Sequence, residues 1–162
     1  MQKEPGMPGC APASYGMTCS VIPQPQGLFT SCLPLAAIPS AVPLARVYVR
    51  QALLHWEQAS LIEDAELVAS ELITNAVKAV HPPAMPTSRH PLVSKIQICL
   101  IVAGDQAVIE VWDPSPALPV MPEGVDHLEE GGRGLFLIDH LAKSWGCRHP
   151  YSGGKTIWCR LR

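Results

Sequence analysis

The sequence has little net charge and no concentrated basic segment. Its 162 residues include 12 lysines and arginines against 14 acidic residues, which gives a formal net charge of −2. A protein that holds nucleic acid or an anionic membrane normally presents a basic face, because each phosphate contact needs a cation. The composition therefore disfavours both kinds of partner, and we expect binding neither to nucleic acid nor to membrane.

The sequence also lacks the cysteine spacings of a zinc or redox site. Its six cysteines form no Cys-x-x-Cys pair, and no histidine lies at a zinc-ligand spacing from any of them. Cys99 and Cys159 fall within apolar alternating runs, where a free cysteine behaves as a small buried hydrophobe. We therefore expect reduced thiols rather than a disulfide framework.

Long uninterrupted apolar runs are missing as well. Eight of the 17 prolines lie within the first 45 residues, and they interrupt any stretch of signal-peptide or membrane-spanning length. This pattern predicts a cytoplasmic protein. It also predicts a disordered tail at residues 1–26, followed at residues 27–162 by one folded domain of sufficient length for a hydrophobic core.

Hydrophobic periodicity predicts the elements of that domain. Apolar residues recur every three to four positions over residues 40–56, 61–80 and 135–145, which indicates three amphipathic helices. Strands are expected at 28–33, 95–102, 107–112, 147–149 and 156–161, with glycine-containing turns at 104–105 and 153–154. Helices and strands segregate along the chain, so the predicted fold class is α+β: a two-layer α/β sandwich whose mixed, mostly antiparallel sheet carries helices on one face.

The second predicted helix carries a polar stripe. Glu71, Asn75 and Lys78 are spaced i, i+4 and i+7, so they lie on one side of the helix beside its apolar face. A carboxylate, an amide and an amine at the border of a core can line a pocket together. An ordinary solvated helix flank would have the same spacing, and this segment alone leaves both interpretations open.

A carboxylate ends one of the predicted strands. Period-two alternation places Asp113 on the same side as Ile109 and Val111, which is the buried side if that face meets the helices. A buried carboxylate needs a hydrogen-bond donor, and the exocyclic amine of adenine is one such donor. An aspartate that caps the turn at Pro114 is the alternative.

A glycine-rich segment leads directly into the third predicted helix. In Gly131-Gly132-Arg133-Gly134-Leu135, the glycines let the backbone approach an anion, and the helix N-terminus offers unpaired N–H groups. The spacing matches neither the Rossmann nor the Walker phosphate-binding motif. Flexible loops are also rich in glycine, so this segment alone is weak evidence for a triphosphate site.

Taken in order, the three segments resemble the nucleotide-binding boxes of the GHKL ATPase superfamily, and most closely those of the bacterial anti-sigma-factor serine kinases. The resemblance covers residues 28–162 and is strongest in the sequences SELITNA at 70–76 and GRGLFLI at 132–138. The sequence GGKTIW at 153–158 adds to it. Members of this superfamily have the Bergerat-type ATP-binding fold, so the resemblance implies the same two-layer sandwich.

The resemblance also implies roles for individual residues. Asn75 would chelate Mg²⁺ through its side-chain oxygen, Glu71 would be the general base for the attacking hydroxyl, and Asp113 would bind adenine. Residues 119–130 would form a lid over the nucleotide. The phosphates would be held by the segment Gly132, Arg133, Gly134 and Leu135, the two glycines and the leucine acting through their backbone amides.

The implied function is that of an ATP- and Mg²⁺-dependent protein serine/threonine kinase that phosphorylates an antagonist protein and sequesters a sigma factor. The resemblance also makes a homodimer one of the expected states. Two departures from the family pattern leave a non-catalytic, nucleotide-responsive binding module as the alternative. The adenine box reads Asp113-Pro114-Ser115 rather than Asp-x-Gly, and Lys155 stands where the family often has threonine. A scaffold that binds no nucleotide is a third possibility.

Overall fold

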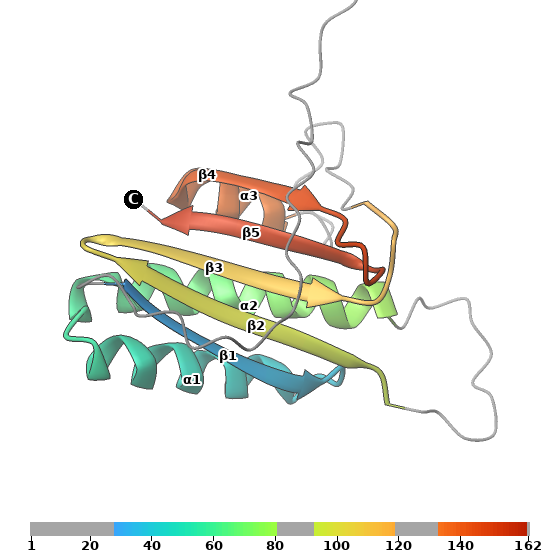
Figure 1. Ribbon diagram of the computed structural model, residues 1–162, viewed down its shortest axis with the longest axis horizontal. Helices are drawn as coiled ribbons and strands as arrows, with labels where there is room; N and C mark the ends of the chain where they lie inside the picture. The colour runs from blue at the N-terminus through green and yellow to red at the C-terminus, as the bar shows by residue number, and fades with distance from the viewer. Residues whose placement is uncertain (1–27, 81–92, 119–132, 162) are drawn as a thin grey trace, which may run out of the picture.

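The structure is a computed structural model that describes residues 28–80, 93–118 and 133–161; the tail predicted at residues 1–26 lies outside them. Helices and strands follow one another in the order that the periodicity predicts (Figure 1). The elements are β1 (Leu28–Ala36), α1 (Ala41–His55), the 3-10 helix η1 (Ala59–Leu61), α2 (Ile62–Val80), β2 (Lys95–Ala103), β3 (Gln106–Asp113), α3 (Arg133–Leu141), β4 (Ala142–Arg148) and β5 (Lys155–Leu161).

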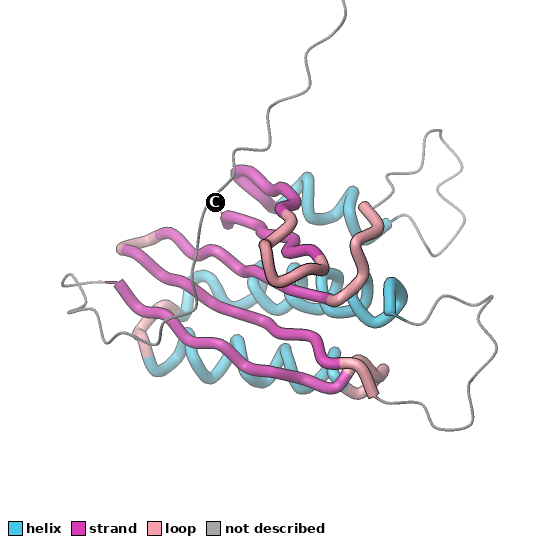
Figure 2. Tube along the Cα trace, turned by 45° about the vertical axis from the view of Figure 1, so that its right-hand side comes forward, coloured by secondary structure: helices cyan, strands magenta, loops and turns pink. Residues whose placement is uncertain are grey.

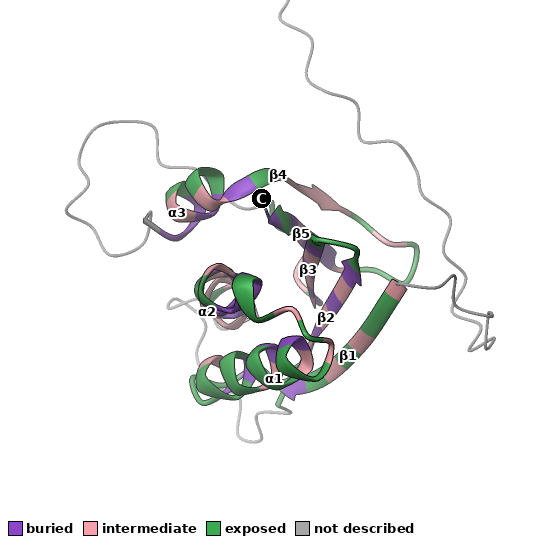
Figure 3. Ribbon diagram, turned by 90° about the vertical axis from the view of Figure 1, so that its left-hand side faces the viewer, coloured by how far each residue is buried: buried purple, intermediate pink, exposed green. Residues whose placement is uncertain are grey.

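The five strands form one sheet in the order β1-β2-β3-β5-β4. Each pair of neighbouring strands is antiparallel, so this sheet is wholly antiparallel rather than mixed. The end-on view in Figure 3 shows α1, α2 and α3 on one side of the sheet. The prediction of a two-layer α+β sandwich with its helices on one face is therefore confirmed.

The core lies between the helices and one face of the sheet. Alternate residues of β2 and β3 are buried toward the helices, as the two-residue period of a strand requires. Helix α1 buries Ala41, Ala45, Val49 and Leu53 against them, and α2 buries the longer stripe. Because these residues are spaced three to four apart, each helix turns one continuous apolar face to the sheet.

An ion pair joins the two long helices at the edge of this core. The Arg50 guanidinium donates two hydrogen bonds to the Glu66 carboxylate, Nε to Oε1 at 2.6 Å and Nη2 to Oε2 at 2.8 Å. This contact holds the pKa of Glu66 below its usual range. Two parallel bonds of this kind fix direction as well as distance, so they set the register of α1 against α2.

The predicted end of the third helix is wrong. Helix α3 ends at Leu141, and the next residues begin strand β4, which the sequence places only at 147–149. Ala142 pairs with Leu161 and Trp145 with Cys159, so the backbone bonds of this segment go to β5. The spacing of Leu141, Ala142 and Trp145 imitates a helical stripe, and the strand partner overrides it.

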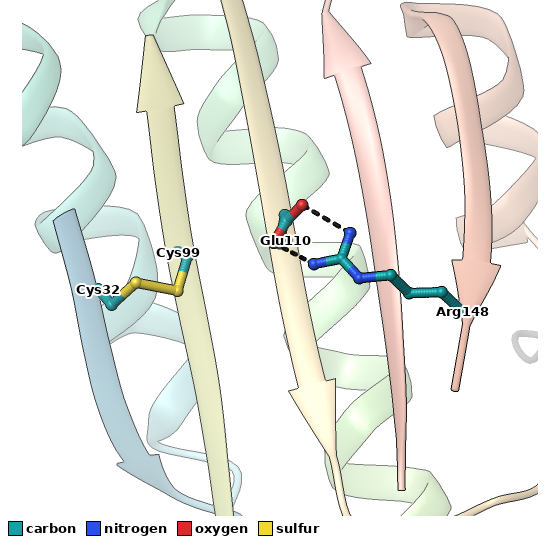
Figure 4. The surroundings of a disulfide bond; sticks show 4 residues. All are labelled: Cys32, Cys99, Glu110 and Arg148. Atoms are coloured by element: carbon teal, nitrogen blue, oxygen red, sulfur yellow. Dashed lines mark hydrogen bonds and ion pairs between the residues drawn. A yellow bond between two sulfur atoms is a disulfide. The ribbon is translucent and has the colours of Figure 1, made fainter. Parts of the chain in front are cut away.

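The prediction that the cysteines are reduced is wrong for one pair. Cys32 and Cys99 form a disulfide that joins β1 to β2 on the face of the sheet away from the helices (Figure 4). The two residues are direct partners in the strand register, with Cα atoms 4.1 Å apart. Cys159 is free and buried as expected, and burial raises the pKa of its thiol to about 12.

A second cross-strand link lies beside the disulfide on this outer face. From β4, the Arg148 guanidinium reaches across β5 and donates to both carboxylate oxygens of Glu110 on β3, at 2.8 and 2.6 Å (Figure 4). Trp158 of β5 packs against Gly146 of β4 on the same face, where an added Cβ would lie 2.8 Å from its ring. Side chains of all five strands thus stiffen a face that no described helix covers.

Among the helices in the described ranges, not one combines the length and the apolar character needed to cross a membrane.

Candidate functional site

Helix α2 is the central element of the candidate site. It packs against β3 on one side and against α3 on another, so it lies between the two other segments that carry the predicted motifs. Figure 2 shows α2 running along the sheet, with the loop after β3 and the turn between β4 and β5 gathered at one end. The predicted motifs therefore lie on elements that contact one another.

Glu71 lies against the start of α3. A Cβ built on Gly134 would overlap Oε2 of Glu71, so only glycine lets the helix start approach this carboxylate so closely. Helix starts carry unpaired N–H groups and a partial positive charge. The structure thus brings together the predicted base and a glycine of the predicted phosphate-binding segment, which lie 63 positions apart in the sequence.

Asn75 lies one turn further along α2. Its Nδ2 atom is buried and has no hydrogen-bond partner among the described residues. A buried amide without a partner costs free energy that a ligand would recover. Since amide oxygen and nitrogen exchange places by rotation about one bond, the open position serves equally for an oxygen that ligates a cation.

Asp113 ends β3 on the buried, helix-facing side, as the alternation predicts. The Lys155 ammonium donates to its Oδ1 at 2.9 Å, and the side chains are only 1% (Asp113) and 3% (Lys155) exposed. The Ser115 backbone N–H donates to the same oxygen at 2.9 Å. Asp113 therefore does cap the turn at Pro114, and it also forms a buried ion pair that the sequence does not reveal.

The turn between β4 and β5 packs tightly against this ion pair. Gly154 has a φ of 73°, and a Cβ there would overlap the Asp113 carbonyl. The Trp112 indole donates to the Gly153 carbonyl at 3.0 Å. His149 Nε2 lies 3.1 Å from the Pro116 carbonyl oxygen, a second link between the same two loops. The turn that contains Gly153 and Gly154 thus packs directly against Asp113 and its neighbour Trp112.

Of the remaining predicted site residues, the structure describes some and leaves others outside the described ranges. Leu135 is buried in the core at the first turn of α3, which orients that helix. Arg133 opens the helix, but its side chain lies outside the described part of the chain. Gly132 and the predicted lid at 119–130 also lie outside it. Lys78, at the end of the polar stripe, is exposed.

Sequence reasoning noted Lys155 as a departure but missed its partner. The available signal is register: once β3 and β5 are paired as antiparallel neighbours, Asp113 and Lys155 lie directly opposite each other. Residues directly opposite in an antiparallel pair point to the same face, so an acid and an amine there form an ion pair.

The arrangement fits a magnesium nucleotide better than a metal held by protein alone. Among the described residues, no three histidine, cysteine, aspartate or glutamate side chains gather as a metal site. Protein-bound Mg²⁺ often takes one or two protein oxygens and completes its shell with phosphates and water. Asn75, with its unpartnered amide, would supply one such ligand, and the glycine-permitted start of α3 would receive phosphate.

Comparison with known proteins finds relatives of this domain. A family model for the histidine kinase-like ATPase domain matches residues 35–161. The serine-protein kinase RsbW of Staphylococcus epidermidis is 30% identical over 91 residues, which cover 49% of this chain and 54% of that protein. RsbW of Staphylococcus aureus strain JH9 is 35% identical over 85 residues. The chain thus spans about half the length of the curated relatives it matches.

A solved structure shows the same fold. The crystal structure of the RsbU and RsbW domains of a Mycobacterium tuberculosis protein superimposes with a TM-score of 0.54 at 20% identity, covering 82% of this chain and 31% of that one. The family model spans most of the sequence, from the end of β1 to the last residue of β5. The chain belongs to the histidine kinase-like ATPase domain family.

Proposed function

We propose that this chain binds Mg-ATP between α2 and the start of α3 and acts as a protein serine/threonine kinase of the anti-sigma-factor type. The observation that carries the proposal is the contact between Glu71 and Gly134, which places a carboxylate beside a helix start suited to phosphate. The relatives named serine-protein kinase RsbW support the same reaction class.

Each residue of the site has a role in this proposal. Bound Mg-ATP supplies the phosphoryl group. The Asn75 amide holds the metal, the amides of Gly132, Gly134 and Leu135 neutralise phosphate charge, and Glu71 orients the substrate hydroxyl and accepts its proton. Phosphoryl transfer depends mainly on positioning and charge neutralisation, so a compact set of groups of this kind is sufficient.

The protein substrate and partner that we propose are those implied by the resemblance to the anti-sigma-factor serine kinases. We propose an antagonist protein as the phosphate acceptor, through a serine or threonine hydroxyl, and a sigma factor as the alternating partner. A hydroxyl side chain on a folded partner can reach Glu71 only if that partner docks beside the nucleotide, which makes binding and transfer interdependent.

Nucleotide binding is tested by titrating Mg-ATP calorimetrically into the wild-type protein and into Asn75→Ala. The proposal predicts saturable, Mg²⁺-dependent binding that weakens at least about tenfold in Asn75→Ala, since a metal ligand is lost. Gln51→Ala is the control, because Gln51 is exposed on α1. Wild-type binding that does not require Mg²⁺, or equal affinity in Asn75→Ala, would reject the assigned site.

Catalysis is tested separately with Glu71→Gln. This variant keeps the shape of the side chain but cannot accept a proton, so it should bind Mg-ATP normally and transfer no labelled phosphate to a candidate antagonist. Transfer at the wild-type rate in Glu71→Gln would remove the catalytic assignment while leaving nucleotide binding intact.

A non-catalytic, nucleotide-responsive binding module is the second candidate function. The buried pair of Asp113 and Lys155 favours it, because Lys155 bonds the aspartate at the position where the family often has threonine, so the contacts to the base depart from those of the kinases. Binding of Mg-ATP that alters partner affinity, without transfer to any partner tested, would support this module over the kinase.

A further inference from the structure

The buried pair between Asp113 and Lys155 changes which nucleobase suits this site. Both described donors to Asp113, the Lys155 ammonium and the Ser115 N–H, bond its Oδ1. Neither of them uses the second carboxylate oxygen, Oδ2. An ionised carboxylate accepts at both oxygens, so Oδ2 remains available to a donor on a ligand.

Lys155 also has capacity left. Its ammonium carries three N–H donors. One bonds Asp113 Oδ1 at 2.9 Å and a second bonds the Ser115 carbonyl at 3.2 Å. Within the described residues the third is not used. Side by side, the pair therefore offers one acceptor and one charged donor, where an aspartate alone would offer only acceptors.

Purine bases differ in what they present to such a pair. A 6-oxo purine has a carbonyl oxygen, O6, next to an N1–H donor, whereas adenine has a 6-amino donor next to a bare N1. Guanine O6 is the purine atom that lysine most often binds, and N1–H can donate to the carboxylate. Charge assistance strengthens both bonds. Adenine can donate its amine to the carboxylate and accept from the ammonium at N1, so the pair gives the 6-amino group no advantage over the 6-oxo group.

We propose that Lys155 determines nucleobase selectivity, so that the subsite beside Asp113 binds 6-oxo purine nucleotides at least as tightly as ATP. This inference rests on the proposed nucleotide site and concerns only the base. Without Lys155, a carboxylate would repel O6 and select the 6-amino group; with it, the repulsion becomes an attraction. Threonine, which the family resemblance leads one to expect at this position, carries no charge to make that change.

The test compares Mg-ATP, Mg-GTP and Mg-ITP by calorimetry on the wild-type protein. ITP has the 6-oxo group of GTP but lacks its 2-amino group. Comparing ITP with ATP therefore isolates the effect of the substituent at position 6 of the purine. The expected result is that both GTP and ITP bind at least as tightly as ATP. Tighter binding of ATP than of either other nucleotide would overturn the inference and leave the proposed function standing, whereas no binding of any nucleotide would overturn the proposed function itself.

Two variants sharpen the test. In Lys155→Met, which keeps most of the side-chain length but removes the donor, the ratio of GTP to ATP affinity should fall about tenfold or more. Lys143→Met, at an exposed position on β4, should leave that ratio unchanged. An unaltered ratio in Lys155→Met would contradict the assignment. If circular dichroism shows that this variant does not fold, the wild-type comparison of the three nucleotides decides alone.

Discussion

Strand β3 carries two acidic residues three positions apart, and each forms an ion pair with a basic residue of a neighbouring part of the sheet. Glu110 faces outward and meets Arg148, with side chains 19% and 38% exposed. Asp113 faces the helices and meets Lys155, with side chains 1% and 3% exposed. The two pairs have similar chemistry and opposite environments.

The contrast separates an ion pair that stiffens the sheet from one that we propose serves a site. A partly exposed pair such as Glu110 and Arg148 gains less than a buried one, because water still reaches both partners. A buried pair must offset a large desolvation cost, and a well-packed apolar pair often does as well, so its retention calls for another reason. The outer face is a stiffened wall, and the inner face holds the buried charges that the proposed site would use to meet a ligand.

The largest effect is expected from breaking the inner pair. Lys155→Met leaves the Asp113 carboxylate buried without its cation and should lower the free energy of unfolding by about 3–5 kcal/mol. Arg148→Met, the matched change on the outer face, should cost less than about 1 kcal/mol. Urea unfolding followed by circular dichroism measures both. Equal losses would mean that the two environments do not differ as the structure indicates.

Reduction of the disulfide on the outer face should have the next largest effect on the free energy of unfolding. Cys32 and Cys99 are separated by 67 positions, so opening the bond frees a long loop in the unfolded chain. We expect reductant to lower the free energy of unfolding by about 2–4 kcal/mol. The double variant Cys32→Ser/Cys99→Ser should be insensitive to reductant; a further loss on reducing it would place the effect elsewhere.

Two glycines compare the faces more finely. Gly146→Ala presses a methyl group on the Trp158 ring and should cost about 1–3 kcal/mol, because a packed aromatic ring cannot easily move aside. Gly134→Ala presses only on the far end of the flexible Glu71 side chain. The free energy of unfolding of Gly134→Ala should therefore change by less than about 1 kcal/mol, since alanine also favours a helix more than glycine does.

For phosphate transfer, we expect the larger loss in Gly134→Ala and the smaller one in Gly146→Ala, the reverse of their effects on stability. Gly134→Ala displaces the Glu71 carboxylate and should lose phosphate transfer, whereas Gly146→Ala should keep transfer at temperatures where it is folded. Transfer assays on both variants check this. A fully active Gly134→Ala would show that the position of Glu71 is not important for the reaction.

Most of the fold could be predicted from the sequence because periodicity reports which face of each element is buried. The alternation in β3 correctly predicts that Asp113 faces inward, and the apolar stripe predicts a long helix at residues 61–80, where α2 spans Ile62–Val80. The failures involve partners distant in the sequence. The spacing of Ala142 and Trp145 predicts helix, but in the structure these residues pair with β5. Local spacing cannot show that pairing.

In the candidate site too, the local features could be predicted from the sequence and the contacts between distant residues could not. Glu71 and Asn75 share a stripe that is visible in the sequence, and the glycine-rich helix start is visible too. The approach of Gly134 to Glu71 and the bond between Lys155 and Asp113 depend on how elements pack and pair. The disulfide between Cys32 and Cys99 was missed for the same reason, because only strand register places the two sulfurs opposite each other.

The most direct test of the nucleotide site is hydrogen exchange measured with and without saturating Mg-ATP. A single site on the helix-facing side predicts added protection together in residues 71–78, 113–118 and 133–138, with β1 and α1 unchanged. Protection of only one of these segments, or protection centred on β1 and α1, would contradict a shared pocket between α2, the end of β3 and the start of α3.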